Sequence, residues 1–344
     1  MTRNASPLLL DLPVGPLGAD MDAVTAADRG DIAGIWSTEV GHDPFLALVP
    51  VAQQTERLVL GTAIAVTFPR SPMVHAQTAW DLHRVSRGRF ILGLGAQVRA
   101  HNERRYSVAG DHPVERMQDA IRAIRAIWSC WQEGGKLSYE GQYYHHTLMT
   151  PFFNPGPLDL PNPFPKIYLA AVSERMLDLA AREVEGIHLH PLHTRGYLAD
   201  IVHARCAEGR AERTVAGDIE LSASVMIAAG STDEEIASLR EQFRGQIAFY
   251  ASTPAYRNVV EHAGYGAICD DLHRMSVRGE WDTMPSLIPD ALLDDVVIAG
   301  RWKDIPALLN DRYHGLVDRV TPYIAADVPG WLAVARELGS MGQK

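Results

Sequence analysis

Short apolar segments with the two-residue period of β-strands alternate with longer segments of helical spacing along most of the chain. The pattern predicts eight strands: residues 8–14, 34–40, 58–66, 89–96, 166–172, 186–192, 219–229 and 318–325. Helices are predicted mainly between them: residues 21–29, 44–55, 73–86, 115–131, 174–184, 197–211 and 330–338, with another helix starting at Thr232. Such alternation is typical of a parallel sheet with crossover helices. Eight units predict an α/β protein with a (β/α)8 TIM barrel.

Two segments are too long for a minimal βα unit, and we expect both to be insertions. One follows the fourth strand at about residues 133–165, and one follows the seventh at about residues 251–316. The first contains a predicted hairpin at 137–145, and the second contains a further helical region at 302–313. Because no linker or internal repeat divides the chain, residues 1–344 are predicted to form a single barrel domain. Long insertions in compact enzymes are commonly lids or binding loops.

Composition and charge narrow the class of partner. The chain is 47% hydrophobic and 22% charged with a net charge of −10, and it contains no dense run of Lys or Arg. These values argue against nucleic acid and anionic membrane surfaces as partners. No apolar stretch is long enough to span a bilayer, residues 1–11 lack a signal-peptide pattern, and the three cysteines are widely spaced. We therefore expect a cytoplasmic protein that acts on a small molecule.

Polar residues follow the second predicted strand, where a TIM barrel places catalytic groups. Glu39 and His42 lie at or just beyond the carboxyl end of this strand. Either side chain is a candidate for proton transfer. The alternative is structural, with Glu39 as a solvated loop acid and Asp43 as the cap of the helix that begins near Pro44.

Glycines and small residues mark the ends of several strands, where backbone can approach a flat ligand closely. The Gly93-Leu94-Gly95 sequence lacks the third glycine of a dinucleotide fingerprint, because Val98 stands in its place, so a dinucleotide site is rejected. Residues 170–175 pass from a strand into a helix. The helix start, with Ser173 and Arg175 as donors, could bind an anion or could simply be a capped helix.

Two further groups are candidates for the wall of a substrate pocket. His188 and His190 share one face of a predicted strand, but the nearby sequence offers no third ligand, so a polar pocket wall is favoured over a metal site. Phe152 and Phe153 lie in the first insertion and would suit a substrate lid. Acid–base or hydride chemistry fits these residues better than covalent catalysis, because no nucleophile elbow or P-loop is present.

Several segments together resemble the bacterial luciferase-like flavin and deazaflavin oxidoreductases. They are residues 34–39, 57–64, 86–95 and 168–171, and their order and spacing match over about residues 8 to 340. The chain looks most like the branch that uses coenzyme F420. The resemblance implies a cofactor ring in the carboxyl-end mouth of the barrel, a cis peptide between Ala63 and Ile64, and a homodimer.

Carried over by position, the resemblance also implies the residues that would line the cofactor. The cofactor would be lined by Thr38, Ala63, Ile64, Ala96, Gln97, Ala171, Val172 and Ser173. The cofactor side chain would lie near Arg99, His101 and Asn102. One departure matters, because Thr38-Glu39 stands where the related alcohol and sugar-phosphate dehydrogenases have Asp-His, so their histidine base is not carried over.

The leading hypothesis is therefore hydride transfer between F420 and a small organic substrate, with Glu39 or His42 moving the accompanying proton. An FMN-dependent luciferase-like monooxygenase is the main competing hypothesis. Two hypotheses from different classes are a metal-assisted TIM-barrel hydrolase built on His188 and His190, and a binding protein of the same fold that holds no cofactor.

Overall fold

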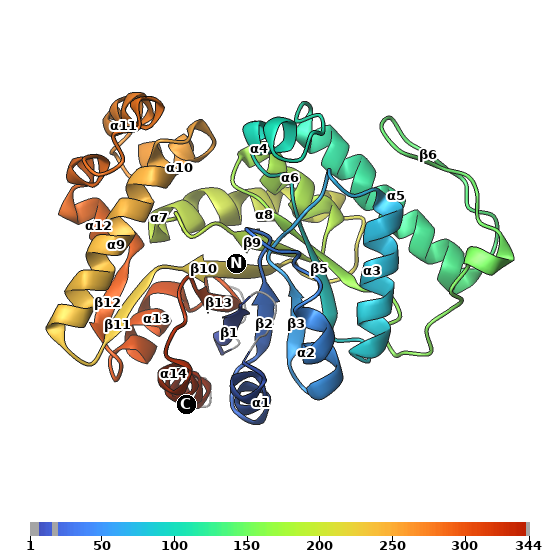
Figure 1. The fold of residues 1–344 in the computed structure, drawn as a ribbon, viewed down its shortest axis with the longest axis horizontal. Helices are drawn as coiled ribbons and strands as arrows, with labels where there is room; N and C mark the ends of the chain where they lie inside the picture. The colour runs from blue at the N-terminus through green and yellow to red at the C-terminus, as the bar shows by residue number, and fades with distance from the viewer. Residues whose placement is uncertain (1–6, 16–19, 342–344) are drawn as a thin grey trace.

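A closed barrel of parallel strands forms the centre of the computed structural model, which describes residues 7–15 and 20–341 (Figure 1). Part of the N-terminal segment considered for a signal peptide lies outside the described residues. The barrel strands are β1 (Leu9–Val14), β2 (Gly34–Ser37), β3 (Val59–Thr62) with β4 (Ala65–Val66), β5 (Phe90–Gly95), β8 (Lys166–Ala170), β9 (Gly186–Leu189), β10 (Glu220–Val225) and β13 (Arg319–Pro322). Because β5 pairs with both β3 and β4, the sheet closes. The predicted TIM barrel is confirmed.

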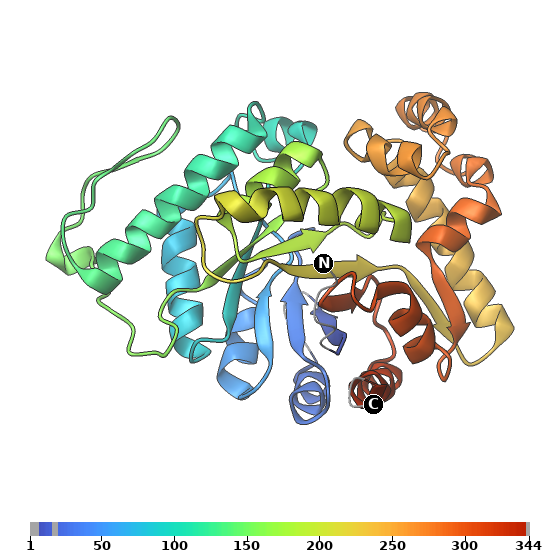
Figure 2. The same cartoon turned by 180° about the vertical axis from the view of Figure 1, so that it is seen from behind.

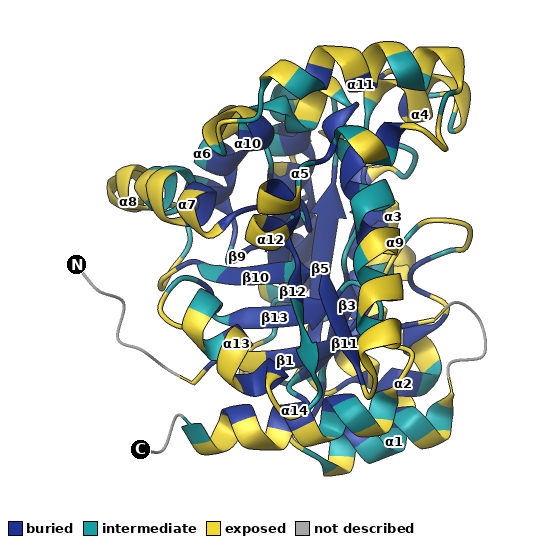
Figure 3. Cartoon of the chain, turned by 90° about the vertical axis from the view of Figure 1, so that its left-hand side faces the viewer, coloured by how far each residue is buried: buried dark blue, intermediate teal, exposed yellow. Residues whose placement is uncertain are grey.

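Helices surround this barrel and bury its outer face, as the colouring by burial in Figure 3 shows. They are α1 (Met21–Arg29), α2 (Leu48–Gln54), α3 (Pro72–Val85), α5 (Pro113–Glu133), α6 (Glu174–Glu183), the continuous run α7 (Arg195–Tyr197), η2 (Leu198–Val202) and α8 (His203–Gly209), then α13 (Ile305–Tyr313) and α14 (Val328–Met341). Side-chain caps mark the first turns of two of these helices. Ser71 and Ser173 accept hydrogen bonds from backbone N–H groups of α3 and α6.

The segment after β5 carries the first set of additional elements. They are α4 (Arg99–Arg104), the hairpin β6 (Tyr139–Glu140) and β7 (His145–His146), and η1 (Pro151–Phe153). The hairpin predicted at 137–145 is confirmed, with Tyr139 opposite His146. Asp119 of α5 anchors it by accepting hydrogen bonds from the Tyr139 hydroxyl and from the backbone N–H groups of Tyr143 and Tyr144.

The segment after β10 is larger and differs from the prediction in its bounds. It comprises β11 (Ile227–Gly230), α9 (Asp233–Ala251), η4 (Pro254–Tyr256), α10 (Arg257–His262), α11 (Ala267–Arg278), η5 (Met284–Leu287), α12 (Asp290–Val296) and β12 (Ile298–Arg301). A separate short helical turn, η3 (Arg210–Glu212), lies between α8 and β10. The predicted strand 219–229 divides at Met226, and its second half pairs with β12 instead of the barrel. The additional elements therefore begin with β11, whereas α13, inside the predicted insertion, belongs to the barrel.

The two sets of additional elements lie on opposite flanks of the barrel, as Figures 1 and 2 show from the two sides. The hairpin lies beside α5, and α9 to α12 lie beyond the end of β10. Within residues 7–15 and 20–341, every helix is too short or too polar to cross a membrane.

Charged side chains form a buried network inside the barrel. Arg319 of β13 is bonded to Asp11 of β1 through two nitrogens, at 2.6 and 2.8 Å, and to Glu220 of β10 at 3.1 Å. The Trp36 indole N–H also donates to Asp11, at 2.8 Å. Burial opposes the charge on Arg319, but the carboxylate of Asp11 keeps its pKa above the ordinary value. The network ties four strands of the closed sheet together.

Three buried histidines, and the partly exposed His190 that packs among aromatic rings, make the fold sensitive to acid. Desolvation lowers the pKa of His75 and His193 to about 4, and of His188 and His190 to about 3. In the unfolded chain each would take up a proton near pH 6.5. Because the unfolded state binds more protons below that pH, the stability they contribute is fully present above about pH 6.5 and is lost as the pH falls toward 4.

We expect the free energy of unfolding to fall between pH 6.5 and pH 4 by up to about 1.4 kcal/mol per pH unit for each of these four histidines. Urea denaturation at half-unit pH steps measures this slope. His193→Gln should lower the slope by about one histidine's share. A flat profile over this range would contradict the assignment.

Candidate functional site

Small side chains form one half of the barrel mouth. Side chains alternate between the two faces of a strand, and Trp36, Ile91 and Tyr168 point into the barrel, where they pack together. On β3 the residue in register with both Trp36 and Ile91 is Gly61. Two or four residues beyond these four positions, the same inward face carries small residues: Thr38, Ala63, Gly95 and Ala170. We call these four residues the small-residue wall. They lie at or just beyond the carboxyl ends of the neighbouring strands β2, β3, β5 and β8, so short side chains face the mouth on this side of the barrel.

Aromatic rings pack beneath this wall and close the barrel below it. The ring centroids of Trp36 and Tyr168 lie 5.9 Å apart, and the His188 ring lies 4.8 Å from Trp36 and 5.2 Å from Tyr168. Glycines on adjacent strands make room for these rings. A Cβ on Gly61 would lie 2.6 Å from Trp36, and one on Gly186 would lie 2.5 Å from Tyr168.

Gly93 and Gly95 serve the closure of the barrel. A Cβ on Gly93 would overlap the carbonyl oxygen of Thr62, and one on Gly95 would lie 2.6 Å from the Ile64 side chain. Thr62 Oγ1 donates to the Gly93 carbonyl at 2.6 Å and accepts from the Gly93 N–H at 3.0 Å. Between β3 and β4 the peptide bond from Ala63 to Ile64 is cis, as predicted.

The turn after β5 adds a second unusual backbone position beside this wall. Gln97 adopts φ of +58°, a region that side-chain-bearing residues rarely occupy and that clusters at functional sites. The Asn102 amide donates to the Ala96 carbonyl at 2.8 Å, and its buried Oδ1 has no hydrogen-bond partner among the described residues. Arg99 and His101 are exposed beside it, and Arg99 pairs with Glu103 at 2.6 Å.

After β8, the chain passes directly into α6. Ser173 caps this helix, and its hydroxyl accepts from the Met176 N–H at 3.3 Å. The Val172 carbonyl accepts from the Tyr197 hydroxyl at 3.0 Å and from the Asn258 amide at 3.3 Å, so α10 helps to hold this segment. Arg175, predicted as an anion donor, points instead to Glu115, with which it pairs at 2.5 Å.

Glu39 holds the end of β2 against the β3–β4 segment. Its Oε2 accepts from the Val66 N–H at 2.7 Å and from Arg70 at 2.8 Å, and its Oε1 accepts from the Tyr106 hydroxyl at 3.2 Å. Burial opposes the charge on Arg70, but Glu39 and Asp43 together keep its pKa above the ordinary value. Both carboxylate oxygens are thus occupied by donors from three other segments, so Glu39 joins the end of β2 to the β3–β4 segment and to the segment after α4.

His42, the second proton-transfer candidate, lies exposed in the loop between β2 and α2. The adjacent Asp43 accepts from the Phe45 and Leu46 N–H groups at 2.8 and 3.2 Å, but it caps the turn that precedes α2. The helix predicted to begin near Pro44 begins at Leu48, where Ala47 is the N-cap and provides no side-chain cap. The structure thus keeps His42 apart from the Glu39 carboxylate network.

Histidine and tyrosine rings form the opposite half of the mouth. His190 follows β9, and Tyr323 follows β13, while Tyr250 and Tyr256 come from α9 and η4. We call these four residues the His–Tyr wall. The ring centroid of His190 lies 4.1 Å from that of Tyr256 and 4.4 Å from that of Tyr250, and the Tyr250 and Tyr323 hydroxyls lie 2.9 Å apart.

The structure separates the two predicted pocket histidines. His188 is buried in the ring layer with Trp36 and Tyr168, whereas His190 is partly exposed in the His–Tyr wall. Within the described ranges 7–15 and 20–341, no three His, Cys, Asp or Glu side chains are grouped so that they could hold a metal ion. The metal-assisted hydrolase therefore has no support in the described structure.

Phe152 and Phe153 do not reach the mouth. They are 91% and 67% exposed and pack edge to face against each other. The loop that follows them is bonded to the outside of α3, because Trp80 and Arg84 donate to the carbonyls of Gly156 and Pro155. A lid role for this pair would need the insertion to move around the barrel wall.

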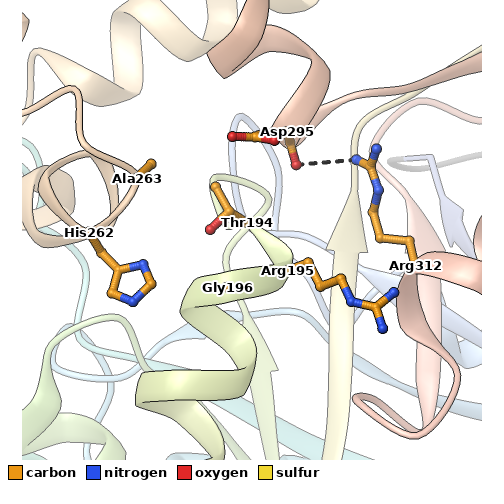
Figure 4. A pocket seen from close by; sticks show the side chains of 7 residues that line it. All are labelled: Thr194, Arg195, Gly196, His262, Ala263, Asp295 and Arg312. Carbon is orange, nitrogen blue, oxygen red and sulfur yellow. Dashed lines mark hydrogen bonds between the residues drawn. The ribbon is translucent and has the colours of Figure 1, made fainter.

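A separate cavity of about 330 Å³ lies outside the barrel, between α7, α10, α12 and α13 (Figure 4). Its lining includes two arginines, but both donate to backbone carbonyls. Arg195 bonds to Asp311 at 2.5 Å, and Arg312 bonds to Asp294 and Asp295 at 3.0 and 3.2 Å. The cavity is therefore a polar seam between the additional elements and the barrel, away from the small-residue wall.

Several residues of the mouth were not found from the sequence. Arg70 and Tyr106 complete the Glu39 network, and Tyr250, Tyr256 and Tyr323 complete the His–Tyr wall. The position of Tyr323 just after the last strand was a usable signal. Nothing in the local sequence marks Tyr250 or Tyr256, because only the folding back of α9 brings them to β9.

Comparison with known proteins identifies a matching family and a similar relative. The family model described as luciferase-like monooxygenase matches residues 4–319. An uncharacterized protein of Mycobacterium tuberculosis, Rv1360, is 43% identical over 309 residues, which is 89% of each chain.

Two solved structures share the fold at low identity. The coenzyme F420-dependent tetrahydromethanopterin reductase from Methanopyrus kandleri has a TM-score of 0.73 at 17% identity, covering 98% of both chains. The oxygenating constituent of 3,6-diketocamphane monooxygenase from Pseudomonas putida, in complex with FMN, has a TM-score of 0.66 at 14% identity, covering 98% of this chain and 97% of that one.

Proposed function

The chain belongs to the luciferase-like monooxygenase family, and from this membership we propose that it is an oxidoreductase that binds F420 and transfers a hydride between this deazaflavin and a small organic substrate. The observation that carries the proposal is the small-residue wall beside the Ala63–Ile64 segment. It offers a planar group a place at the carboxyl end of the barrel, where such barrels have their sites. The expected cytoplasmic homodimer stays a prediction.

The residues of this half of the mouth fit a planar redox ring. Ala63, Ile64, Ala96 and Gln97 would contact the ring, with Thr38 at its edge, and the segment from Ala171 to Ser173 would contribute main-chain groups. Asn102 supports the fit because its buried Oδ1 still lacks a donor. Bound F420 would supply a carbon centre that accepts or donates a hydride. The chain's own contribution would be to fix ring and substrate in contact and to exclude water.

A titration distinguishes this proposal from the FMN-dependent monooxygenase. Purified protein is titrated with F420 and with FMN while the absorbance and fluorescence of each cofactor are followed. We expect saturable binding of F420 and much weaker binding of FMN, in line with the sequence resemblance to the F420 branch. Tight FMN binding with oxygen consumption would instead support a monooxygenase, and no binding of either cofactor would reject the proposal.

The geometry also changes the role proposed for Glu39. We expect Glu39→Gln to weaken F420 binding and to lower turnover together, by roughly three- to thirtyfold, because a neutral amide weakens the charged bonds to Arg70 and Val66 that position the β3–β4 segment. Parallel binding titrations and steady-state kinetics measure both effects. A loss of turnover with unchanged F420 affinity would return Glu39 to the role of proton carrier.

His42→Gln is the matched comparison for this experiment, since it replaces the second proton-transfer candidate with an amide. His42 is exposed and lies outside the carboxylate network, so its replacement should leave F420 affinity unchanged. Any loss of turnover in His42→Gln would then report proton transfer and not positioning.

A further inference from the structure

The strand order places the His–Tyr wall directly across the mouth from the Ala63–Ile64 segment. His190 and Tyr323 follow β9 and β13, the two strands on either side of β10. Counting around the closed sheet in either direction, β10 is the fourth strand from β3. A ring held on the small-residue wall would therefore present its free face toward the His–Tyr wall.

Side-chain direction supports this placement. On β9 the inward face carries His188, and on β13 it carries Arg319, which bonds to Asp11 inside the barrel. Two and four residues further along the same faces come His190 and Tyr323. Both side chains are partly exposed, so they can meet a ligand in the mouth. Beyond Val225 the chain turns away into β11, which leaves the space above β10 to the His–Tyr wall.

The hydrogen bonds of His190 determine what it offers to a ligand. Its Nδ1 accepts from the Leu192 N–H at 3.1 Å, so in the neutral ring the proton resides on Nε2. Burial among rings, with a smaller contribution from His193, lowers the pKa of His190 to about 3, so the ring is uncharged at neutral pH. In the described residues, the aromatic contacts of this ring are to Tyr250 and Tyr256.

We propose that the His–Tyr wall is the substrate-recognition surface of the mouth and that it selects an uncharged, largely apolar molecule with an acceptor oxygen such as a carbonyl. The His190 Nε2–H and the Tyr323 hydroxyl are the donors to that oxygen, and Tyr250 orients the Tyr323 hydroxyl through their 2.9 Å contact. An anion finds no positive charge on these four side chains and would lose its hydration without compensation. The inference deepens the proposed function and rests on it for the identity of the site.

Binding of matched neutral and anionic probes tests this proposal. Three pairs are used: acetone with acetate, cyclohexanone with cyclohexanecarboxylate, and acetophenone with benzoate. Their dissociation constants are measured by ligand-observed NMR on the full chain at pH 7.5, with and without saturating F420. We expect the ketone of at least one pair to bind at least about tenfold more tightly than its carboxylate. Equal or tighter binding of the carboxylate in every pair, or no ketone binding at all, would overturn the proposal.

Two variants test whether a preference for ketones depends on the two proposed donors, the His190 Nε2–H and the Tyr323 hydroxyl. His190→Asn can keep an acceptor for the Leu192 N–H while removing the donor at Nε2, and Tyr323→Phe keeps the ring contacts with Phe243 and Tyr250 while removing the hydroxyl. Each should weaken ketone binding by about three- to tenfold, the worth of one neutral hydrogen bond. Tyr265→Phe, the same change outside the wall, should leave it unaltered. Ketone binding that is unchanged in both wall variants would also refute the assignment.

The F420 titration separates the failure of this inference from that of the proposed function. If F420 binds but neither the ketone preference nor its dependence on His190 and Tyr323 appears, only the recognition surface is wrong. If the ketone preference appears and F420 does not bind, the His–Tyr wall is supported as the recognition surface and the deazaflavin proposal is refuted.

Discussion

Replacement of Asp11 by alanine is expected to destabilise the protein by about 3–5 kcal/mol. The carboxylate is fully buried and bonds to Arg319 through both oxygens and to the Trp36 indole. Among the described residues, its loss leaves the Arg319 guanidinium inside the barrel with the Glu220 carboxylate as its remaining hydrogen-bonded carboxylate. Removing one member of a buried pair is costly because the remaining charge is no longer compensated. Urea denaturation followed by circular dichroism measures the loss.

An exposed ion pair provides the control for this measurement. Asp218 pairs with Arg210 at 2.7 Å, but both side chains are largely exposed. Asp218→Ala should cost less than about 1 kcal/mol, because water solvates the remaining arginine. If Asp11→Ala cost no more than Asp218→Ala, the buried network would not be what joins β1, β10 and β13.

Replacement of Gly93 by alanine is expected to have the second large effect, on stability and on cofactor binding together. The new Cβ would overlap the Thr62 carbonyl oxygen, which is backbone and cannot rotate away as a side chain could. Overpacking of this kind costs about 1–3 kcal/mol and sometimes more, and we expect the upper end of that range. Because Thr62 directly precedes Ala63, the shift should also weaken F420 binding by at least tenfold.

Gly339→Ala is the matched control, since nothing lies within 4 Å of a Cβ at that position of α14. There the same substitution should be neutral or should stabilise the protein by up to about 1 kcal/mol, through higher helix propensity. Thermal unfolding and the F420 titration, run on both variants, measure the two effects. A Gly93→Ala protein with wild-type stability and affinity would show that β3 and β5 tolerate a wider spacing.

The substrate-facing half of the mouth illustrates where sequence reasoning ended. His190 was singled out because it shares a strand face with His188, yet the structure puts these two residues in different layers, one buried and one partly exposed. Phe152 and Phe153 were singled out as exposed aromatics in an insertion, and they lie on the outside of the barrel. Exposure and residue type are local properties, whereas the face on which a loop lies depends on the packing of distant helices.

The sequence by itself determined the barrel and the position of the small-residue wall. Strand period, helix caps and glycine positions are local consequences of backbone sterics and burial, and in a parallel barrel every strand ends at the same mouth. Only the tertiary structure decided the rest. It turned Glu39 from a free acid into the partner of Arg70 and Tyr106, and it brought Tyr250 and Tyr256 to His190. These contacts join residues between 31 and 67 positions apart, at separations where local sequence patterns carry no information about which side chains meet.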